Sequence, residues 1–249
     1  MIKKNSVILM LCLYFLHPSI ANTPLSEAHF MIWNVGQGQW VTAVEFDRCL
    51  HFDFGGEFFQ LKEIKTSYLR NCKNKRNELY LSHPDYDHYS FMPFIIKNSL
   101  HTCWAGQSIP HLKRTDVGSI EFCKGSPNKH LRPEIIYQNK LAKNKNESSV
   151  VYMYKGFLFP GDSTAKQELI WSQNLVRRSI KYLNVGHHGS KTSSSLKLLN
   201  HLPDLRFAFV QARKKKYGHP HKEVISRFEK NKIPIFRTED WGHITIKVN

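Results

Sequence analysis

The chain has 249 residues, of which 41% are hydrophobic and 12% are aromatic, enough to form the core of one sizeable α/β domain. No segment beyond the first 21 residues is long and apolar enough to cross a bilayer, which excludes a multispanning membrane protein. The formal net charge of +16 at pH 7 favours a polyanionic partner, namely nucleic acid, an anionic envelope polymer or a membrane surface.

Residues 1–21 have the features of a secretory signal. Lys3 and Lys4 form a charged start, residues 7–16 an apolar stretch, and Ser19-Ile20-Ala21 a cleavage site of small residues. The apolar stretch of about ten residues is shorter than the roughly twenty that a spanning helix needs. We therefore expect residues 1–21 to be a signal peptide and residues 22–249 to form a single domain, exported to the periplasm or the extracellular space.

Four cysteines remain after such a cleavage: Cys49, Cys72, Cys103 and Cys123. None stands in a Cys-x-x-Cys arrangement, which argues against a cysteine zinc site. An even number of cysteines in an oxidising compartment permits two disulfides, with three possible pairings. We expect all four to be structural.

Short strands and helices alternate along the chain. We expect strands at residues 29–33, 40–46 and 49–53, a helix at 59–72, a strand at 78–82 and a helix at 89–97. Residues 101–140 are rich in Pro and Gly and favour short strands and loops. We then expect a hairpin of 150–154 with 157–159, a helix near 164–177, a strand at 182–185, a helix near 193–199, a strand at 206–211, a helix near 222–230, and strands at 235–237 and 244–248.

The segment His83-Pro84-Asp85-Tyr86-Asp87-His88, directly after the apolar residues 79–81, holds four potential metal ligands in six residues. Imidazole and carboxylate groups hold zinc, manganese or iron in hydrolytic sites, where open positions on the metal activate water. Side chains with this spacing on a loop that leaves a strand can converge on two adjacent cations. The alternative is a polar surface loop that is rich in His and Asp by chance.

Four further sites stand at predicted strand ends or helix starts, where α/β folds place functional groups. They are Asp53 before Gly55-Gly56, Asp162 after residues 157–161, His187-His188-Gly189-Ser190 after residues 182–185, and Tyr217-Gly218-His219-Pro220-His221 before a helix. Each alone is a weak signal, because a strand-end Asp is often a turn former and adjacent histidines are often merely exposed. Their presence in one chain favours a shared site.

The order of these motifs resembles the metallo-β-lactamase-like domain of the ComEC competence proteins. The resemblance rests on Asn34-Val35-Gly36-Gln37-Gly38, Asp53-Phe54-Gly55, the His83 segment, Gly161-Asp162 and the two later histidine motifs, and it spans about residues 29–248. It implies an α/β fold, the metallo-β-lactamase αβ/βα sandwich of two mixed sheets flanked by helices, with a dinuclear metal site at one edge. It does not include the family's membrane channel, so we expect a stand-alone, exported version.

The resemblance also implies a set of candidate ligands for two divalent ions: His83, Asp85, Asp87, His88, Asp162, His187 and His188. The first two would hold one ion and the next two the other, with Asp162 as the bridge. One of the last two histidines would complete the second ion, and the Gly-His-His-Gly spacing does not choose between them. Asp53 matches a family acid that supports the metal loop from behind the ligands.

Departures from the broader superfamily bear on the metal. Asp85 stands where His is common, and Asn146-Glu147-Ser148-Ser149-Val150 replaces a stretch that carries a further His. A larger share of oxygen ligands shifts the preference from zinc toward manganese, so we expect one or two ions of Zn or Mn. Asn34 and Gln39 stand where the family often has Asp, which softens the negative charge near the site.

The ligand set predicts attack of metal-activated water on phosphorus, with Asp87 in a catalytic role. His219 and His221, at a helix N-terminus, could bind a phosphate oxygen or protonate the leaving group, although simple packing at the helix start also explains His219. Further substrate contacts are expected from Ser190, Lys191, Asn146 and Ser149.

Three functions fit the sequence. The leading hypothesis is a secreted metal-dependent phosphodiesterase, a nuclease acting on DNA, because charge, export signal and resemblance agree. The first alternative keeps the site but acts on an envelope phosphoester, such as phosphorylcholine on teichoic acid. The second is a non-catalytic basic DNA-binding module with a degenerate site, against which the intact Asp87, His88 and Asp162 argue. Asp85 and the His-His-Gly-Ser pattern disfavour β-lactam hydrolysis.

Overall fold

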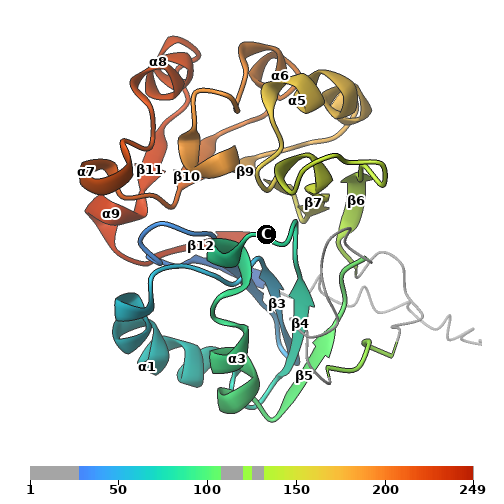
Figure 1. Ribbon diagram of the computed structural model, residues 1–249, viewed down its shortest axis with the longest axis vertical. Helices are drawn as coiled ribbons and strands as arrows, with labels where there is room; N and C mark the ends of the chain where they lie inside the picture. The colour runs from blue at the N-terminus through green and yellow to red at the C-terminus, as the bar shows by residue number, and fades with distance from the viewer. Residues whose placement is uncertain (1–27, 108–119, 125–131, 249) are drawn as a thin grey trace, which may run out of the picture.

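Two six-stranded sheets face each other and carry helices on their outer sides (Figure 1). The computed structural model describes residues 28–107, 120–124 and 132–248, so the proposed signal peptide lies outside the described residues. Within those ranges, no helix has the length and apolar character that crossing a membrane requires.

Both sheets are mixed. The first has the strand order β12 (Ile244–Val248), β1 (Ala28–Ile32), β2 (Val41–Val44), β3 (Arg48–Phe52), β4 (Arg76–Tyr80) and β5 (His101–Trp104). The second has the order β11 (Ile235–Arg237), β10 (Phe207–Val210), β9 (Tyr182–Asn184), β8 (Phe157–Phe159), β7 (Val151–Tyr154) and β6 (Glu134–Tyr137). Strands β3 to β5 run parallel, as do β8 to β11. Parallel neighbours deliver their carboxyl ends to one edge, where α/β folds place their sites.

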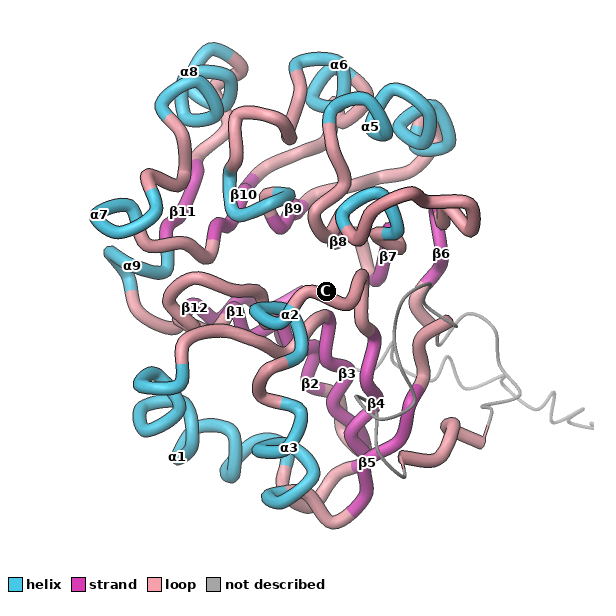
Figure 2. Tube along the Cα trace, viewed as in Figure 1, coloured by secondary structure: helices cyan, strands magenta, loops and turns pink. Residues whose placement is uncertain are grey.

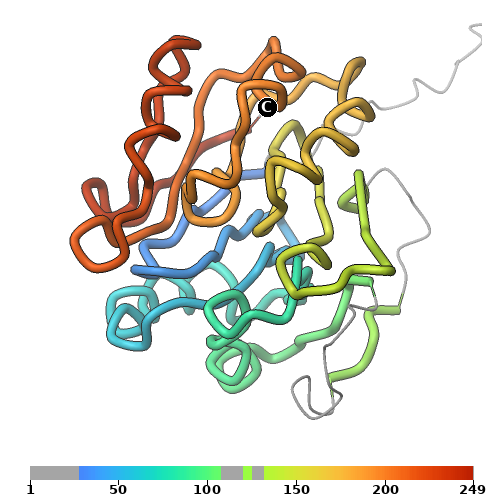
Figure 3. The backbone as a smooth tube through the Cα atoms, turned by 45° about the horizontal axis from the view of Figure 1, so that its top comes forward, coloured from blue at the N-terminus to red at the C-terminus, as the bar shows by residue number. Residues whose placement is uncertain are grey.

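The longer helices cover the two outer faces (Figure 2). They are α1 (Leu61–Cys72) and α3 (Met92–Asn98) on the first sheet, and α5 (Ala165–Trp171), α6 (Leu196–Asn200) and α8 (Lys222–Lys230) on the second. The short helices are α2 (Tyr86–Tyr89), α7 (Lys214–Tyr217) and α9 (Thr238–Trp241), with 3₁₀ turns η1 (Phe58–Gln60), η3 (Asn146–Ser148), η4 (Ser172–Leu175) and η5 (Gly186–Gly189). Figure 3 shows the same division, with the blue-to-green and yellow-to-red parts of the chain on opposite sides, except that the C-terminal β12 joins the first sheet beside β1.

Aromatic side chains fill the space between the sheets. Phe52 on β3 stacks on Phe159 on β8 with ring centroids 3.9 Å apart, and Phe30 lies 5.0 Å from Phe157. Because side chains alternate along a strand, Leu158 faces the other way and joins the core under α5, α6 and α8. Each sheet is therefore buried on both sides in its centre, which fixes the position of the strand ends that carry the site.

Both expected disulfides are present, and the structure selects the pairing. Cys49 on β3 is bonded to Cys72 at the end of α1, and Cys103 on β5 is bonded to Cys123. The first bond ties the helix to the sheet, and the second holds residues 120–124 beside the edge strand. The structural role predicted for all four cysteines is thus confirmed.

The helix predicted at residues 89–97 is wrong in its boundaries. The chain forms α2 over Tyr86–Tyr89 and then a separate α3 from Met92. Pro93 occupies the first turn of α3, where its missing N–H costs nothing, so the helix restarts there. Two of the four potential ligands in the motif, Asp87 and His88, consequently lie on a helical turn rather than an open loop. The sequence also did not predict α7 and α9.

A buried histidine makes the stability of this fold sensitive to acid. Trp40 Nε1 donates to His51 Nδ1 at 3.1 Å, and His51 Nε2 lies 2.8 Å from Asn77 Oδ1. Burial lowers the pKa of His51 from 6.5 to about 4, and the hydrogen bond with Asn77 offsets part of that effect. Since the unfolded chain binds the proton first, the stabilisation is present above pH 6.5 and is lost as the pH falls toward 4.

We therefore expect the free energy of unfolding to fall by up to about 3 kcal/mol between pH 7 and pH 4 through this residue alone. Chemical denaturation of the wild type and of His51→Gln over that range measures the effect, because the amide cannot titrate. Parallel loss of stability in the two proteins would contradict the assignment to His51.

Candidate metal centre

Three loops bring the predicted ligands together at the edge where the two sheets meet. Residues 81–85 leave β4 and enter α2, residues 160–164 leave β8, and residues 185–190 leave β9 and contain η5. Figure 2 shows α2 in the centre of the view, between the two sheets. The loops therefore come from both halves of the fold.

Two groups of side chains among the described residues have a spacing that suits a metal ion. One comprises His83, His88 and Asp162, and the other comprises Asp87, His88 and His188, with the ligand atoms of each group within 4.8 Å of one another. Asp162 Oδ1 lies 3.2 Å from His88 Nε2, and Asp162 Oδ2 lies 3.7 Å from His83 Nε2. Asp87 Oδ2 lies 3.2 Å from His188 Nε2. Because His88 is in both groups, the two positions are adjacent.

The imidazoles at the centre are oriented by contacts on their outer nitrogens. His88 Nδ1 lies 2.8 Å from Asp53 Oδ2, and His188 Nδ1 lies 3.2 Å from the Gln211 backbone oxygen. Each contact directs the Nε2 atom of its ring into the cluster, where the two Nε2 atoms lie 3.3 Å apart. Metal-binding histidines are held in this way by an acceptor on the second nitrogen.

Two buried atoms that face the cluster have no hydrogen-bond partner among the described residues: His83 Nε2 and Asp162 Oδ1. The other nitrogen of His83 lies 2.9 Å from Ser82 Oγ, so the unpartnered Nε2 points inward. Buried polar atoms without a partner are rare and call for an explanation such as a bound ion. Imidazole nitrogens and carboxylate oxygens are also the ligands that divalent ions prefer. The residues present therefore fit a divalent cation.

Asp53 supports this cluster from behind. Its Oδ1 accepts the Ser82 backbone N–H at 2.7 Å, while its Oδ2 accepts Gln39 Nε2 at 2.8 Å and Ser82 Oγ at 2.9 Å, in addition to the contact with His88. The family often has Asp at the position of Gln39. A carboxylate there would repel Asp53, whereas the Gln39 amide donates a hydrogen bond to it. The departure from the family pattern thus has a local hydrogen-bonding role.

Backbone contacts fix α2 against the loop that follows β3. Gln39 N donates to Asp87 O at 3.1 Å, and Phe54 N donates to His88 O at 2.7 Å. A Cβ atom on Gly55 would lie 2.4 Å from Asp87 O, so only glycine permits this close approach. The two ligands on α2 are therefore positioned by their main chain as well as by their side chains.

The cluster holds opposite charges close together. Burial alone would lower the pKa of His88, but Asp162 and Asp53 outweigh it and raise the pKa well above its usual value. Burial would also lower the pKa of His188, but Asp162 and Asp87 outweigh it and raise this pKa. Burial would raise the pKa of Asp162, but the neighbouring imidazoles hold it well below its usual value. A cation would have to displace the imidazole protons, so metal binding should release protons and weaken as the pH falls.

The two adjacent histidines have different surroundings. The His187 side chain is 24% exposed, and its Nε2 lies 3.6 Å from Asp162 Oδ2 and 3.4 Å from Asn146 Nδ2. The His188 side chain is 4% exposed and contacts Asp87 and His88. Both residues have φ near 50°, a conformation that turns their rings to different sides. The geometry favours His188 for the second ligand group and places His187 at the rim.

We accordingly expect His188→Ala to weaken metal binding by more than about 100-fold, the upper end of what loss of a supporting residue costs. His187→Ala should weaken it by less than about tenfold. Titration of the metal-free variants with Mn²⁺ or Zn²⁺, monitored by calorimetry, distinguishes the two residues. Equal losses in both variants, or the reverse order, would contradict this choice.

Asp85 lies at the rim of the cluster and is shared with a cation from another loop. Its Oδ2 lies 3.4 Å from His83 Nε2, and its Oδ1 lies 3.1 Å from Lys145 Nζ. The nearby His83 ring and the Lys145 ammonium lower the pKa of Asp85 against the effect of burial. Lys145, which the sequence pattern did not single out, therefore competes with a cation for this carboxylate.

The predicted substrate contacts have diverse positions. Ser149 Oγ accepts the Asp162 backbone N–H at 3.1 Å, so it positions that carboxylate. Ser190 Oγ lies 3.0 Å from Thr192 Oγ1 and is mostly buried. Lys191 is exposed. The structure thus brings Ser149 to the cluster as a supporting residue and leaves Lys191 facing solvent.

The two histidines of the last motif, His219 and His221, also have different surroundings. The His219 ring lies 6.5 Å from the His187 ring, and its buried Nδ1 has no hydrogen-bond partner among the described residues. His221 instead caps α8, because its Nδ1 accepts the Glu223 backbone N–H at 3.3 Å. His219 borders the cluster, whereas the helix start accounts for His221.

Gln211 is a supporting residue that the sequence did not reveal. Its Nε2 donates to Trp33 O at 2.8 Å and to Trp40 O at 2.7 Å, while its backbone oxygen contacts His188. It follows β10, so it joins the second sheet to the first beneath the cluster. A lone Gln at a strand end carries no sequence signal for this role.

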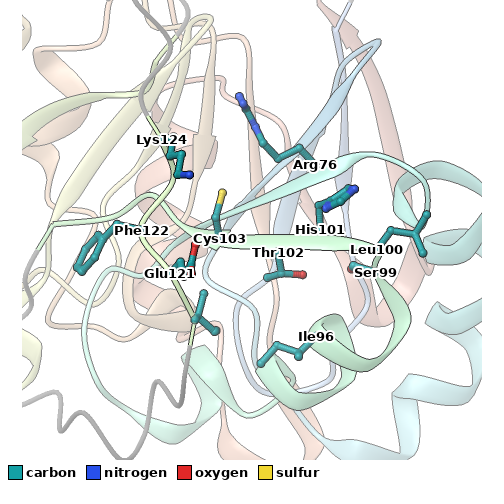
Figure 4. Close-up of a pocket in the computed structure, with 11 residues that line it drawn as sticks. Arg76, Ile96, Ser99, Leu100, His101, Thr102, Cys103, Glu121, Phe122 and Lys124 are labelled. Atoms are coloured by element: carbon teal, nitrogen blue, oxygen red, sulfur yellow. The ribbon is translucent and has the colours of Figure 1, made fainter.

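A separate cavity of about 800 Å³ lies away from the cluster (Figure 4). It is lined by Arg76 and His101, at the starts of β4 and β5, and by Leu100 and Phe122. The metal loop follows the opposite end of β4. Because this cavity holds no cluster of metal ligands in the described part of the chain, it does not compete as the chemical site.

No family model matches the chain. It is similar to recombination protein 2 of Haemophilus influenzae, with 28% identity over 225 residues that cover 86% of this chain and 28% of that protein. It is also similar to competence protein ComA of Neisseria gonorrhoeae, with 27% identity over 231 residues that cover 87% of this chain and 32% of that protein. This chain therefore spans about a third or less of these relatives.

Solved structures show the fold. The metallo-β-lactamase fold protein YhfI of Bacillus subtilis aligns with a TM-score of 0.56 and 10% identity over 89% of this chain and 99% of that one. A variant of the β-hydroxylase CmlA aligns with a TM-score of 0.55 and 10% identity over 90% of this chain and 54% of that one. Together with the two mixed sheets, these matches confirm the predicted fold class. The chain is therefore a relative of the ComEC competence proteins and has the metallo-β-lactamase fold.

Proposed function

We propose that this protein is a metal-dependent phosphodiesterase that cleaves DNA. The observation that carries the proposal is the buried cluster of candidate ligands. Two of its atoms, His83 Nε2 and Asp162 Oδ1, are buried without a hydrogen-bond partner among the described residues. A site made only for structure would pair these atoms, because each unpaired group costs about 1–3 kcal/mol.

The proposed ligands divide between two positions. The first is formed by His83 and Asp162, with Asp85 at its rim, and the second by Asp87, His88, His188 and Asp162. When bound, a divalent cation supplies a water of lowered pKa and stabilises charge that develops on the phosphate. Asp162 Oδ2 lies 3.7 Å from His83 Nε2 and 3.9 Å from His188 Nε2, and its Oδ1 lies 3.2 Å from His88 Nε2, so the carboxylate is near ligands of both positions, which supports its role as the bridge.

Other residues of the chain are proposed to hold the substrate. His219 borders the cluster beside His187 and can donate a hydrogen bond to a phosphate oxygen. Lys145, with 52% of its side chain exposed beside Asp85, can contact the same phosphate. The His219 N–H and the Lys145 ammonium would together orient a phosphodiester over the cluster, and such positioning lowers the barrier to reaction.

The choice of DNA is supported by charge and by the relatives. The formal charge of +16 suits a polyanion, and the relatives are named for competence and recombination. Export is proposed from the signal-like residues 1–21 and from the two disulfides, which persist in oxidising compartments.

Metal analysis combined with a substrate panel tests the proposal. Protein purified without added metal is analysed for bound ions and then incubated with plasmid, single-stranded DNA, RNA and bis(p-nitrophenyl) phosphate, with Mn²⁺ or Zn²⁺. We expect DNA cleavage that stops when a chelator is added and returns with metal. Hydrolysis of small phosphodiesters without cleavage of any nucleic acid would sink the nuclease assignment and favour an envelope phosphoester.

A further inference from the structure

Three aromatic side chains are exposed beside the metal cluster. Phe58, Phe59 and Tyr86 are 55%, 59% and 60% exposed, although aromatic residues usually contribute to the core. Phe58 and Phe59 are in η1 and Tyr86 begins α2, so they come from two separate segments. A group of exposed apolar side chains next to a site indicates a binding surface.

Two of these side chains are neighbours, and one of them belongs to the metal loop. The Phe58 and Tyr86 rings lie 6.3 Å apart between centroids. Tyr86 stands between Asp85 and Asp87 in the metal loop, and Asp87 contacts His188. A flat molecule stacked on Tyr86 would therefore lie against the loop that carries Asp85 and Asp87.

A basic segment borders the same surface. The Arg213 guanidinium lies 5.2 Å from the centre of the Phe59 ring. Glu57 holds both Arg213, at 2.8 Å, and Lys216, at 3.0 Å. Residues 213–216 carry four positive charges beside the carboxylates of Glu57 and Glu239, so this edge keeps a positive surplus.

We propose that Phe58, Phe59 and Tyr86 form a stacking subsite for unpaired bases, with Arg213 and Lys216 binding the phosphates beside them. The inference rests on the proposed function, which makes nucleic acid the substrate. Aromatic faces stack on any base, and neighbouring cations follow the backbone, which is how single strands are bound without sequence preference. In a duplex the base faces are hidden, so the subsite selects single-stranded nucleic acid or frayed ends.

Binding of matched oligonucleotides tests this subsite. The probes are a fluorescent oligothymidylate, an abasic deoxyribose-phosphate strand of equal length, and a hairpin duplex. We expect the full-length wild type to bind the oligothymidylate more tightly than the other two. Phe58→Ala and Phe59→Ala should each weaken that binding by about tenfold and leave the affinity for the abasic strand unchanged. Phe58→Tyr should restore the affinity.

The matched control is Phe46→Ala, because Phe46 is 90% exposed in the turn between β2 and β3. The Mn²⁺ or Zn²⁺ content of all these variants, measured by mass spectrometry, should equal that of the wild type, which shows that the cluster is intact. Equal affinity of the wild type for the abasic strand and the oligothymidylate, or an equal effect of Phe46→Ala, would overturn the subsite. If binding depends on the bases but no phosphodiester is hydrolysed, the proposed function fails and the subsite stands.

Discussion

Replacing Asp162 with alanine is expected to remove metal binding and to lower phosphodiester hydrolysis by about 10³-fold or more, since the metal contributes several kcal/mol to transition-state stabilisation. Asp162 lies within 4 Å of four imidazoles. Its distances are 3.7 Å to His83, 3.2 Å to His88, 3.6 Å to His187 and 3.9 Å to His188. It is thus the carboxylate that contacts both ligand groups, so its loss should affect both positions at once.

Metal content, measured by mass spectrometry of the purified variants, and initial rates on DNA provide the readouts. Asp162→Asn keeps the shape but removes the charge and should behave like the alanine variant. Asp47→Ala is the matched control, because Asp47 is exposed in the turn before β3. Circular dichroism establishes that the variants fold. Wild-type metal content and rate in Asp162→Ala would show that the cluster is not the reaction centre.

Most strands and helices could be predicted because their signals are local, whereas β5 and β6 lie in residues 101–140, for which no strand bounds were predicted. The predicted strand at 49–53 corresponds closely to β3, and the predicted helix at 59–72 contains α1. The pairing of the strands could not be predicted, because it depends on contacts distant in sequence. Strand β12 pairs with β1, with Ala28 opposite Val248. No local sequence pattern indicates that the two ends of the described chain pair in one sheet. The disulfide pairing was open for the same reason.

In the candidate site, too, local features could be predicted from sequence and contacts between distant residues could not. The ligands on residues 83–88 could be proposed from sequence, because their spacing lies within one motif. The choice between His187 and His188 could not be made from sequence, because it depends on the backbone. Both residues have left-handed backbone angles, which direct their rings to different sides. The contact of Lys145 with Asp85 likewise depends on the approach of a loop from the other half of the fold.

Replacing Asp53 with asparagine is expected to weaken metal binding by about 10–100-fold, although Asp53 is not among the proposed ligands. Asp53 receives donors on both oxygens: the Ser82 N–H on Oδ1, and Gln39 Nε2, Ser82 Oγ and His88 on Oδ2. Either orientation of an asparagine amide puts its NH₂ against at least one of these donors. If the NH₂ faces His88, the ring must shift its proton to Nε2, which then cannot bind a cation. Asparagine also tolerates the left-handed φ of 50° at this position, so the backbone is conserved.

Asp53 has two proposed roles: it orients His88, and it holds the surrounding loops together. Metal titration measures the first role, and chemical denaturation measures the second. Asp53→Ala leaves several buried donors unpaired, at about 1–3 kcal/mol each, and should lower the free energy of unfolding by about 3 kcal/mol or more. Asp53→Asn should lower it less while still weakening the metal. Gln39→Ala, which removes one side-chain contact with Asp53, is the matched control and should reduce affinity less than Asp53→Asn. If Asp53→Asn loses stability but binds metal as tightly as the wild type, Asp53 holds the loops together without orienting His88.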